Sequence, residues 1–402
     1  MLTFQDALNT ILNNLTPTAP RRLQLEECLG LTLAEDIFAA EDIPCFDNSA
    51  MDGYAVRSAD VTTATAESPV SLRALERVPA GRSPSHEVSQ GTAIKVMTGG
   101  MIPVGADAVV PVEMVEESGS AILVKRSARF GENIRPAGED LKKGEPALSA
   151  GTVLNSYKLA LLAAVGAANP LVYPAPRVGL LATGSELIPI ASALEPGKVR
   201  DSASVAIAAR LREIGAVPVR GEAVADVQSE VESRLASLAE TVDVIVTIGA
   251  VSMGDYDYVR PAVDKLGQII FWKVAIRPGS PFLFGRIRGK PLFGLPGNPA
   301  SAMITFETLA RPALMKMMGK ASTPGRLVRA ISEAAIKDRE GRTSFVRGIY
   351  VSDSGAARVK PVGPQGSGLH KPMAEANCLI VIPENTAEIA EGDEVEALCF
   401  ES

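Results

Sequence analysis

The stretch Phe293-Gly294-Leu295-Pro296-Gly297-Asn298-Pro299 joins a short apolar run to a long segment of helical periodicity, and it decides how the middle of the chain folds. Asn298 is a good helix N-cap, and Pro299 would take the first helical position, where its missing N–H costs nothing. The N–H groups and the dipole of that helix would then face an anion at the loop. The turn therefore predicts one wall of a phosphate-binding site.

Two segments upstream of this turn carry further polar groups. An apolar strand at 242–248 leads into the loop 249–257, which is rich in Gly, Ser and Asp. The segment 271–279 carries Lys273 and Arg277, which are four positions apart and would share one side of a strand. We therefore expect both cations to point at one anion, as in a site for a phosphate-bearing ligand with a metal ion.

Strands and helices alternate around these segments. Further strands are predicted at 177–182 and 217–219, and helices are predicted to begin after Asp201, at Asp226 and at Asp257. This alternation predicts a mostly parallel sheet that is covered on both faces. Ligands bind at the carboxyl ends of such strands. The loops expected there are 183–186, 249–257 and 294–299.

The flanking regions have a different character. Thr3 can cap a helix that ends near Thr16, and residues 157–165 are predicted to form a short helix rich in Ala and Leu. Short strands are predicted at 70–75, 92–97, 108–112 and 122–124. Beyond Gly319, five short alternating runs (326–332, 343–351, 357–362, 378–382 and 394–400) predict a small β-barrel or sandwich.

Composition excludes several classes of protein. The 402 residues carry a formal charge of −7, which argues against general nucleic-acid binding. Four scattered cysteines and two histidines make a zinc site improbable and fit a reduced, cytoplasmic setting. The N-terminus lacks a basic signal-peptide region, and the most apolar run, 159–172, is too short to cross a membrane.

Carboxylates beside or near glycine are the candidate metal ligands. Glu186 and Asp257 would flank the same crevice, where one or two carboxylates can hold Mg²⁺ together with water and phosphate oxygens. Asp52 and Asp140 lie in earlier glycine-containing loops. Asp226 and Asp257 also stand where an N-cap would be, and for Asp226 capping alone is equally consistent with the sequence.

Several motifs occur together and in a characteristic order. They are 47–56 (DNSAMDGYAV), 97–99 (MTG), 133–135 (NIR), 138–140 (GED), 182–187 (ATGSEL), 251–257 (VSMGDYD), 271–279 (FWKVAIRPG), 294–299 (GLPGNP), 366–368 (GSG) and 376–380 (ANCLI). By these motifs the chain strongly resembles the MoeA-type molybdopterin molybdenumtransferases, to which the C-terminal part of gephyrin is related.

The resemblance implies a multidomain fold, α/β plus β. It implies a discontinuous linker-like domain (1–45 and 141–168), an inserted β domain (46–140), a central parallel-sheet α/β molybdopterin-binding domain (169–319) and a C-terminal β-barrel (320–402). It also implies a homodimer, with the active cleft between the α/β domain of one subunit and the inserted domain of the other. Other proteins of molybdenum cofactor biosynthesis are possible partners.

The implied reaction is Mg²⁺-dependent insertion of molybdate into adenylylated molybdopterin, with release of AMP. Carried over by motif, the catalytic residues are Asp52, Asp140, Glu186, Asp257, Lys273 and Arg277, and the metal ligands are Glu186 and Asp257. The substrate-binding residues are Thr98, Arg135, Thr183, Gly184, Asp226, Ser252, Gly254, Pro296, Gly297, Asn298, Pro299 and Ser367.

Four positions around the predicted pocket depart from the family pattern: Ala203, Ala250, Arg277 and Ser280. The methyl group of Ala250 matters if that backbone needs a positive φ or touches a ligand. Two alternatives therefore stay open: a molybdopterin adenylyltransferase, whose family shares the α/β domain, and a divergent paralogue that binds or scaffolds molybdopterin without turnover.

Overall fold

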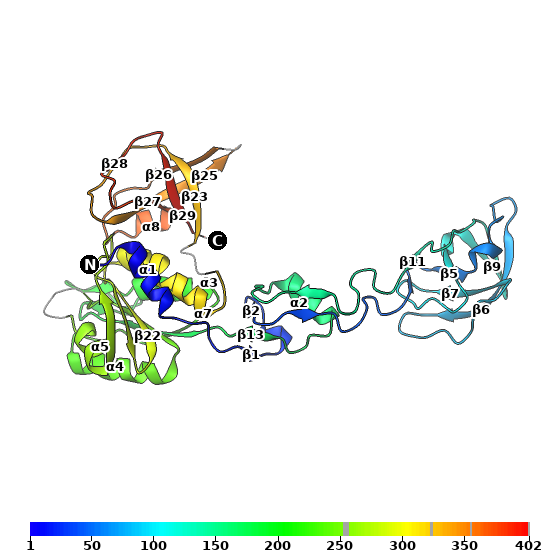
Figure 1. The fold of residues 1–402 in the computed structure, drawn as a ribbon, viewed down its shortest axis with the longest axis horizontal. Helices are drawn as coiled ribbons and strands as arrows, with labels where there is room; N and C mark the ends of the chain where they lie inside the picture. The colour runs from blue at the N-terminus through cyan, green and yellow to red at the C-terminus, as the bar shows by residue number, and fades with distance from the viewer. Residues whose placement is uncertain (252–256, 322–324, 354–355, 401–402) are drawn as a thin grey trace. The chain divides into compact units, whose positions relative to one another are not determined.

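The computed structural model describes residues 1–251, 257–321, 325–353 and 356–400 (Figure 1). The chain forms two compact units. The first comprises Met1–Arg22, Gly30–Ala34 and Leu171–Ser402, and the second comprises Leu23–Leu29 and Glu35–Pro170. Among the described residues, no helix has both the length and the apolar character needed to cross a membrane.

A six-stranded sheet forms the centre of the first unit, in the order β17-β14-β18-β22-β21-β19. Four neighbouring strands run parallel: β17 (Val217–Arg220), β14 (Arg177–Ala182), β18 (Val244–Ile248) and β22 (Lys290–Leu295). The other two, β21 (Leu283–Ile287) and β19 (Gly267–Trp272), are antiparallel. The predicted mostly parallel sheet is confirmed.

Helices cover both faces of this sheet because alternate strand residues point to opposite sides. Val244 and Val246 belong to the core that contains Ile207 and Leu211 of α3 (Ala203–Glu213). Ile245 belongs to the opposite core, which is built from α4 (Gln228–Thr241) and α5 (Val259–Leu266). The strands are therefore buried on both faces.

The helix that follows the 293–299 turn is continuous but changes type along its length. It runs through α6 (Pro299–Thr305), a π-helical segment η4 (Phe306–Ala310) and α7 (Arg311–Met317). Phe306, Leu309 and Leu314 are fully buried in the same core as α3. This helix therefore fixes the turn against the body of the sheet.

The N-terminal helix belongs to the first unit. Thr3 caps α1 (Phe4–Asn13) as predicted, because its side chain accepts a hydrogen bond from the backbone N–H of Asp6. Ala7, Leu8 and Ile11 are buried in the α/β core. The apolar face of this helix therefore packs on the α/β domain.

A closed β-barrel follows, in the strand order β20-β25-β26-β23-β29-β27, with β27 also paired to β25. The strands are β20 (Ile276–Arg277), β23 (Arg326–Ser332), β25 (Thr343–Asp353), β26 (Ala356–Pro361), β27 (Cys378–Ile382) and β29 (Glu394–Cys399). A short helix, α8 (Lys371–Glu375), precedes β27. The five predicted runs are confirmed, and β20 adds a strand from the segment 271–279.

The second unit contains another six-stranded sheet, in the order β8-β5-β7-β6-β10-β9. Its strands are β5 (Gly53–Val56), β6 (Val70–Val78), β7 (Thr92–Val96), β8 (Ala108–Pro111), β9 (Val115–Ser118) and β10 (Ala121–Val124). The four predicted strands of this region are confirmed. The helix expected at 157–165 is α2 (Ser156–Ala164).

The remaining strands are short. They are β1 (Arg21–Arg22), β2 (Thr32–Leu33), β3 (Ile37–Phe38), β4 (Asn48–Ser49), β11 (Ile134–Arg135), β12 (Pro146–Leu148), β13 (Leu171–Tyr173), β15 (Leu187–Ile188), β16 (Val199–Arg200), β24 (Ile336–Lys337) and β28 (Glu388–Ile389). Of these, β4 lies within the 47–56 motif and pairs with β11.

Candidate functional site

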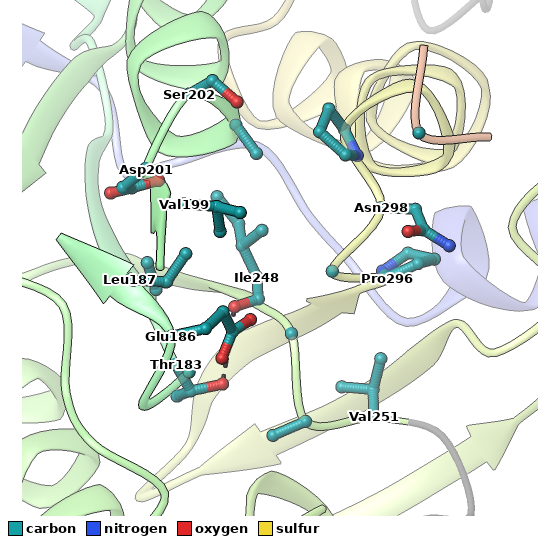
Figure 2. Close-up of a pocket in the computed structure, with 18 of the residues that line it drawn as sticks. Thr183, Glu186, Leu187, Val199, Asp201, Ser202, Ile248, Val251, Pro296 and Asn298 are labelled. Carbon is teal, nitrogen blue, oxygen red and sulfur yellow. Dashed lines mark hydrogen bonds between the residues drawn. The ribbon is translucent and has the colours of Figure 1, made fainter. Parts of the chain in front are cut away.

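A cavity of about 620 Å³ opens at the carboxyl ends of β14, β18 and β22 (Figure 2). The loops predicted to meet there do meet. Nine of the predicted site residues line the cavity: Thr183, Gly184, Glu186, Asp226, Asp257, Pro296, Gly297, Asn298 and Pro299. Ser252 and Gly254 lie outside the described residues.

The loop after β14 leaves room for the carboxylate of Glu186 beside Gly184. A side chain at Gly184 would place its Cβ 2.7 Å from a carboxylate oxygen of Glu186, and the φ of Gly184 is 154°. Thr183 anchors the loop, since its N–H donates to the carbonyl of Ile248 at 3.0 Å and its hydroxyl to the same oxygen at 3.5 Å (Figure 2). The glycine is therefore needed for Glu186 to lie where it does.

Asp226 is fixed to that same loop. Its carboxylate accepts from the N–H of Ser185 at 2.9 Å, and the hydroxyl of Ser185 accepts from the N–H of Asp226 at 3.0 Å. The N-cap of α4 is Val227, so capping alone, the alternative left open for Asp226, is wrong. Asp257 precedes Tyr258, the N-cap of α5, and also lines the cavity.

The turn 293–299 has the predicted backbone but a different capping arrangement. Asn298 is the N-cap and Pro299 follows at the first helical position, yet the side chain of Asn298 makes no capping hydrogen bond. The N–H of Ala300 donates to the carbonyl of Ser367 at 3.1 Å. Because this donor is already used, the predicted seat for an anion on the N–H groups of the first helical turn is smaller than expected.

The barrel supplies part of the cavity wall. Gly368 and His370 line the cavity. The predicted ligand contact Ser367 does not line it, although its neighbour Gly368 does. The Nε2 of His370 lies 3.4 Å from the hydroxyl of Ser202. Sequence reasoning missed His370 and Ser202, because 168 positions separate them and only the tertiary fold brings them together.

Asp201 is a further lining residue, which sequence reasoning treated only as a helix cap. It is 6% exposed, and its carboxylate accepts from the N–H of Ser204 at 3.1 Å and from Nη2 of Arg220 at 3.1 Å. Arg220 does not line the cavity, whereas Arg200 does and donates to the carbonyls of Ile190 and Ser192. The cavity is therefore richer in carboxylates than in cations.

The loop after β18 is tight. A Cβ at Gly249 would lie 2.6 Å from the carbonyl oxygen of Thr183. The next residue, Ala250, has a φ of 50° although it is not glycine. The condition under which its methyl group was expected to matter is therefore met.

The expectation that Lys273 and Arg277 share one side of a strand is wrong. The strand β19 ends at Trp272, Lys273 has a φ of 72°, and Arg277 lies in the separate strand β20. The Nζ of Lys273 lies 4.3 Å from the centre of the Trp272 ring, and Arg277 forms an ion pair with Asp338 of the barrel. Neither cation lines the cavity.

Four predicted residues lie in the second unit. Oδ1 of Asp52 accepts from both the N–H and the hydroxyl of Thr98, each at 2.8 Å, and these bonds, the one from the backbone first, lower the pKa of Asp52. Arg135 lies in β11, and the N–H of Asp140 donates to the carbonyl of Ile43 at 3.0 Å. Asp52 and Thr98 thus form one cluster within this unit.

The described residues include no group of three Asp, Glu, His or Cys side chains that could hold a metal ion by themselves. The cavity does offer the carboxylates of Glu186, Asp226 and Asp257 on adjoining loops. Mg²⁺ commonly keeps several waters and uses one or two carboxylates together with phosphate oxygens. The donor set therefore fits Mg²⁺ carried with a phosphate ligand, and it does not fit a metal held by protein ligands alone.

Three family descriptions match consecutive parts of the chain. Residues 2–166 match the MoeA N-terminal region (domain I and II), residues 179–316 the "Probable molybdopterin binding domain", and residues 329–400 the MoeA C-terminal region (domain IV).

Whole-length relatives agree with these matches. The chain is 35% identical to the molybdopterin molybdenumtransferase of Haemophilus influenzae over 98% of both chains. It is 36% identical to molybdopterin molybdenumtransferase 2 of Mycobacterium tuberculosis over 98% of this chain and 99% of the relative. A crystal structure of the molybdopterin biosynthesis MoeA protein from Pyrococcus horikoshii is similar over 100% of both chains, with a TM-score of 0.84 and 30% identity.

Proposed function

The chain belongs to the MoeA family and is a transferase of molybdenum cofactor biosynthesis, and we propose that it inserts molybdate into adenylylated molybdopterin with release of AMP. The observation that supports this reaction most directly is the single cavity at the carboxyl ends of β14, β18 and β22. It combines glycine turns, on which a phosphate can lie close to the backbone, with three carboxylates on adjoining loops.

The residues that line the cavity would bind the metal ion and the phosphate groups of the substrate. Glu186 and Asp257 would hold Mg²⁺, which neutralises charge on the pyrophosphate when it is bound. Asp226, bonded reciprocally to Ser185, keeps the loop that carries Glu186 in place. The backbone around Gly297, where an added Cβ would contact only the Cα of Gly249 at 3.5 Å, lets a phosphate approach closely.

The remaining predicted contacts would come from the second unit of another copy of the chain. Asp52 and Thr98, with Arg135 and Asp140, would complete the cleft in a homodimer. The hydrogen bonds from Thr98 lower the pKa of Asp52 and fix its carboxylate in place, so this carboxylate is able to orient a donor group of the substrate.

The test is to incubate the purified protein with adenylylated molybdopterin, Mg²⁺ and molybdate, and to follow AMP. We expect AMP release that depends on all three components and is lost in Glu186→Gln, a variant that keeps the shape of the side chain and removes its charge. No AMP above that variant would contradict the proposal.

Two alternatives predict different outcomes in the same experiment. A molybdopterin adenylyltransferase would form adenylylated product from ATP and molybdopterin. The matches of the N-terminal and C-terminal regions to MoeA descriptions favour the insertion reaction over this alternative. A non-catalytic paralogue would bind the adenylylated compound without releasing AMP.

A further inference from the structure

Arg347, in the barrel strand β25, is a buried charge without an acidic partner. The residue is 1% exposed, and no ion pair joins it to any carboxylate among the described residues. Burial lowers the pKa of this guanidinium. A buried charge is costly unless strong hydrogen bonds compensate it, so its presence needs an explanation.

Among the described residues, the hydrogen bonds of this guanidinium go to one loop, residues 364–370. Its two Nη atoms donate to the carbonyls of Leu369 at 3.2 Å, Pro364 at 3.2 Å and Gly366 at 3.1 Å. Its Nε donates to Oε1 of Gln365 at 3.1 Å. One side chain therefore holds the backbone of the whole loop.

Gln365 completes this arrangement. Its Oε1 also accepts from the backbone N–H of Arg347 at 2.9 Å, and its Nε2 donates to the carbonyls of Arg347 at 3.2 Å and Val362 at 3.0 Å. The loop is therefore tied to strand β25 from both the backbone and the side chain.

The same loop forms the barrel's part of the cavity wall, through Gly368 and His370. Its carbonyls at 364, 366 and 369 are turned to Arg347, and that of Ser367 is turned to the N–H of Ala300. The N–H groups of Gly368 and His370 make no hydrogen bond to another residue within the described ranges. Most of the carbonyl oxygens of this wall are thus engaged elsewhere, and two backbone donors are left over.

We propose that Arg347 is a positioning residue that shapes loop 364–370 to receive an oxyanion of the substrates, either molybdate or a phosphate of the nucleotide. This inference rests on the proposed function for the identity of the ligand. A charge-free side chain would suffice if the loop had only to be filled, whereas a guanidinium turns the carbonyl oxygens of the loop toward itself, behind the cavity wall.

The test compares Arg347→Met and Arg347→Lys with the control Arg358→Met, which removes an exposed barrel arginine whose ion pair with Glu333 spans 3.8 Å. Calorimetry measures the binding of AMP alone and of molybdate alone, which separates the two sources of the oxyanion. Hydrogen exchange measures the amides of residues 364–370, and thermal unfolding measures the fold.

We expect Arg347→Met to unfold cooperatively, to exchange the loop amides faster and to bind at least one of the two anions about ten-fold more weakly or worse. Lysine, which keeps the charge with fewer directed donors, should fall between this variant and the wild type. The control should bind both anions like the wild type. Faster loop exchange with unchanged binding of both anions overturns the proposal, and so does a wild type that binds neither.

A second variant covers the case in which Arg347→Met does not fold. Gln365→Met keeps the guanidinium of Arg347 and removes the amide that bonds to Arg347 and Val362. This variant should loosen the loop and weaken anion binding to a lesser degree than Arg347→Met. Unchanged binding with a loosened loop in this variant is again contrary to the proposal. Since these measurements need no turnover, a failure of AMP release in the wild type would count against the proposed function and leave this test standing.

Discussion

At the scale of the residue, Ala250 shows how a single methyl group bears on the site. It lines the cavity between Gly249 and Val251 with a φ of 50°, in the region that side chains other than glycine adopt only with strain. The family that the chain resembles usually has glycine at this position. The strain is therefore a property of this chain, located in the wall that faces the ligand.

Replacing Ala250 by glycine is expected to stabilise the protein. Relief of the positive-φ strain should exceed the entropic cost of glycine, for a net gain of up to about 1 kcal/mol in the free energy of unfolding. Urea unfolding measures it. The matched control is Ala223→Gly in an exposed loop without a positive φ, which should lose about 0.5–1 kcal/mol. A loss of stability in Ala250→Gly would show that this backbone is not strained.

Thr98 and Asp52 predict a pH dependence. The ordinary pKa of the aspartate, 3.8, is lowered first by the backbone N–H and then by the hydroxyl of Thr98. A carboxyl with a lowered pKa in the folded state stabilises the protein above its unfolded-state value, and that stabilisation is lost as the pH falls through the folded-state pKa. Thr98→Val removes only the hydroxyl bond.

We therefore expect the pKa of Asp52 in Thr98→Val to rise toward 3.8 without reaching it, because the backbone bond remains. The stability difference from the wild type should be constant at neutral pH and should vanish in acid below 3.8. Carboxyl NMR and unfolding at several pH values check both expectations. Thr98→Ser, which keeps the hydroxyl, should titrate like the wild type, and an unchanged pKa in Thr98→Val would contradict the assignment.

At the scale of the element, strand β20 explains why Lys273 and Arg277 do not share one side of a strand as predicted. The alternating pattern of 271–279 suggested one strand, but the positive φ of Lys273 ends β19, and Ile276 and Arg277 pair with β25 of the barrel. The side chain of Asp338, the partner of Arg277, is 7% exposed. The arginine thus has a structural task that its spacing from Lys273 did not reveal.

Arg277→Ala is expected to lower the free energy of unfolding by about 1–3 kcal/mol, because it leaves the buried carboxylate of Asp338 without its partner. Adding Asp338→Asn should recover much of the lost stability, because it removes the unpaired buried charge of Asp338. We expect AMP release to return together with stability in the double variant. A double variant that is stable but inactive would instead place Arg277 at the substrate.

At the scale of the whole molecule, the candidate residues are divided between two compact units. The cavity belongs to the first unit, and Asp52, Thr98, Arg135 and Asp140 belong to the second. A homodimer that shares its active clefts would explain this division, as the resemblance implies.

Mixing two inactive variants tests the shared cleft. Asp52→Asn and Glu186→Gln lie in different units, so a heterodimer would contain one cleft with both defects and one intact cleft. After unfolding and refolding together, the mixture should recover about a quarter of the wild-type AMP release, as random pairing gives. Each variant refolded alone should stay inactive. No recovery from a mixture that sedimentation shows to be dimeric would mean that each cleft is built from one chain.

The sequence by itself determined the helices, the strands and the loops that meet at the cavity, because hydrophobic periodicity and turn residues act locally. It correctly indicated nine of the residues that line the cavity, since strand-end loops of a parallel sheet converge whatever the details of packing. Only the tertiary structure decided the rest. His370 and Ser202 meet across 168 positions, and Arg347 binds a loop 17 to 22 positions later in the chain. The strand β19 ends before Lys273, which has a positive φ, and Arg277 pairs with the barrel in a separate strand. Neither long-range contacts nor one backbone angle leaves a periodic signal in the sequence.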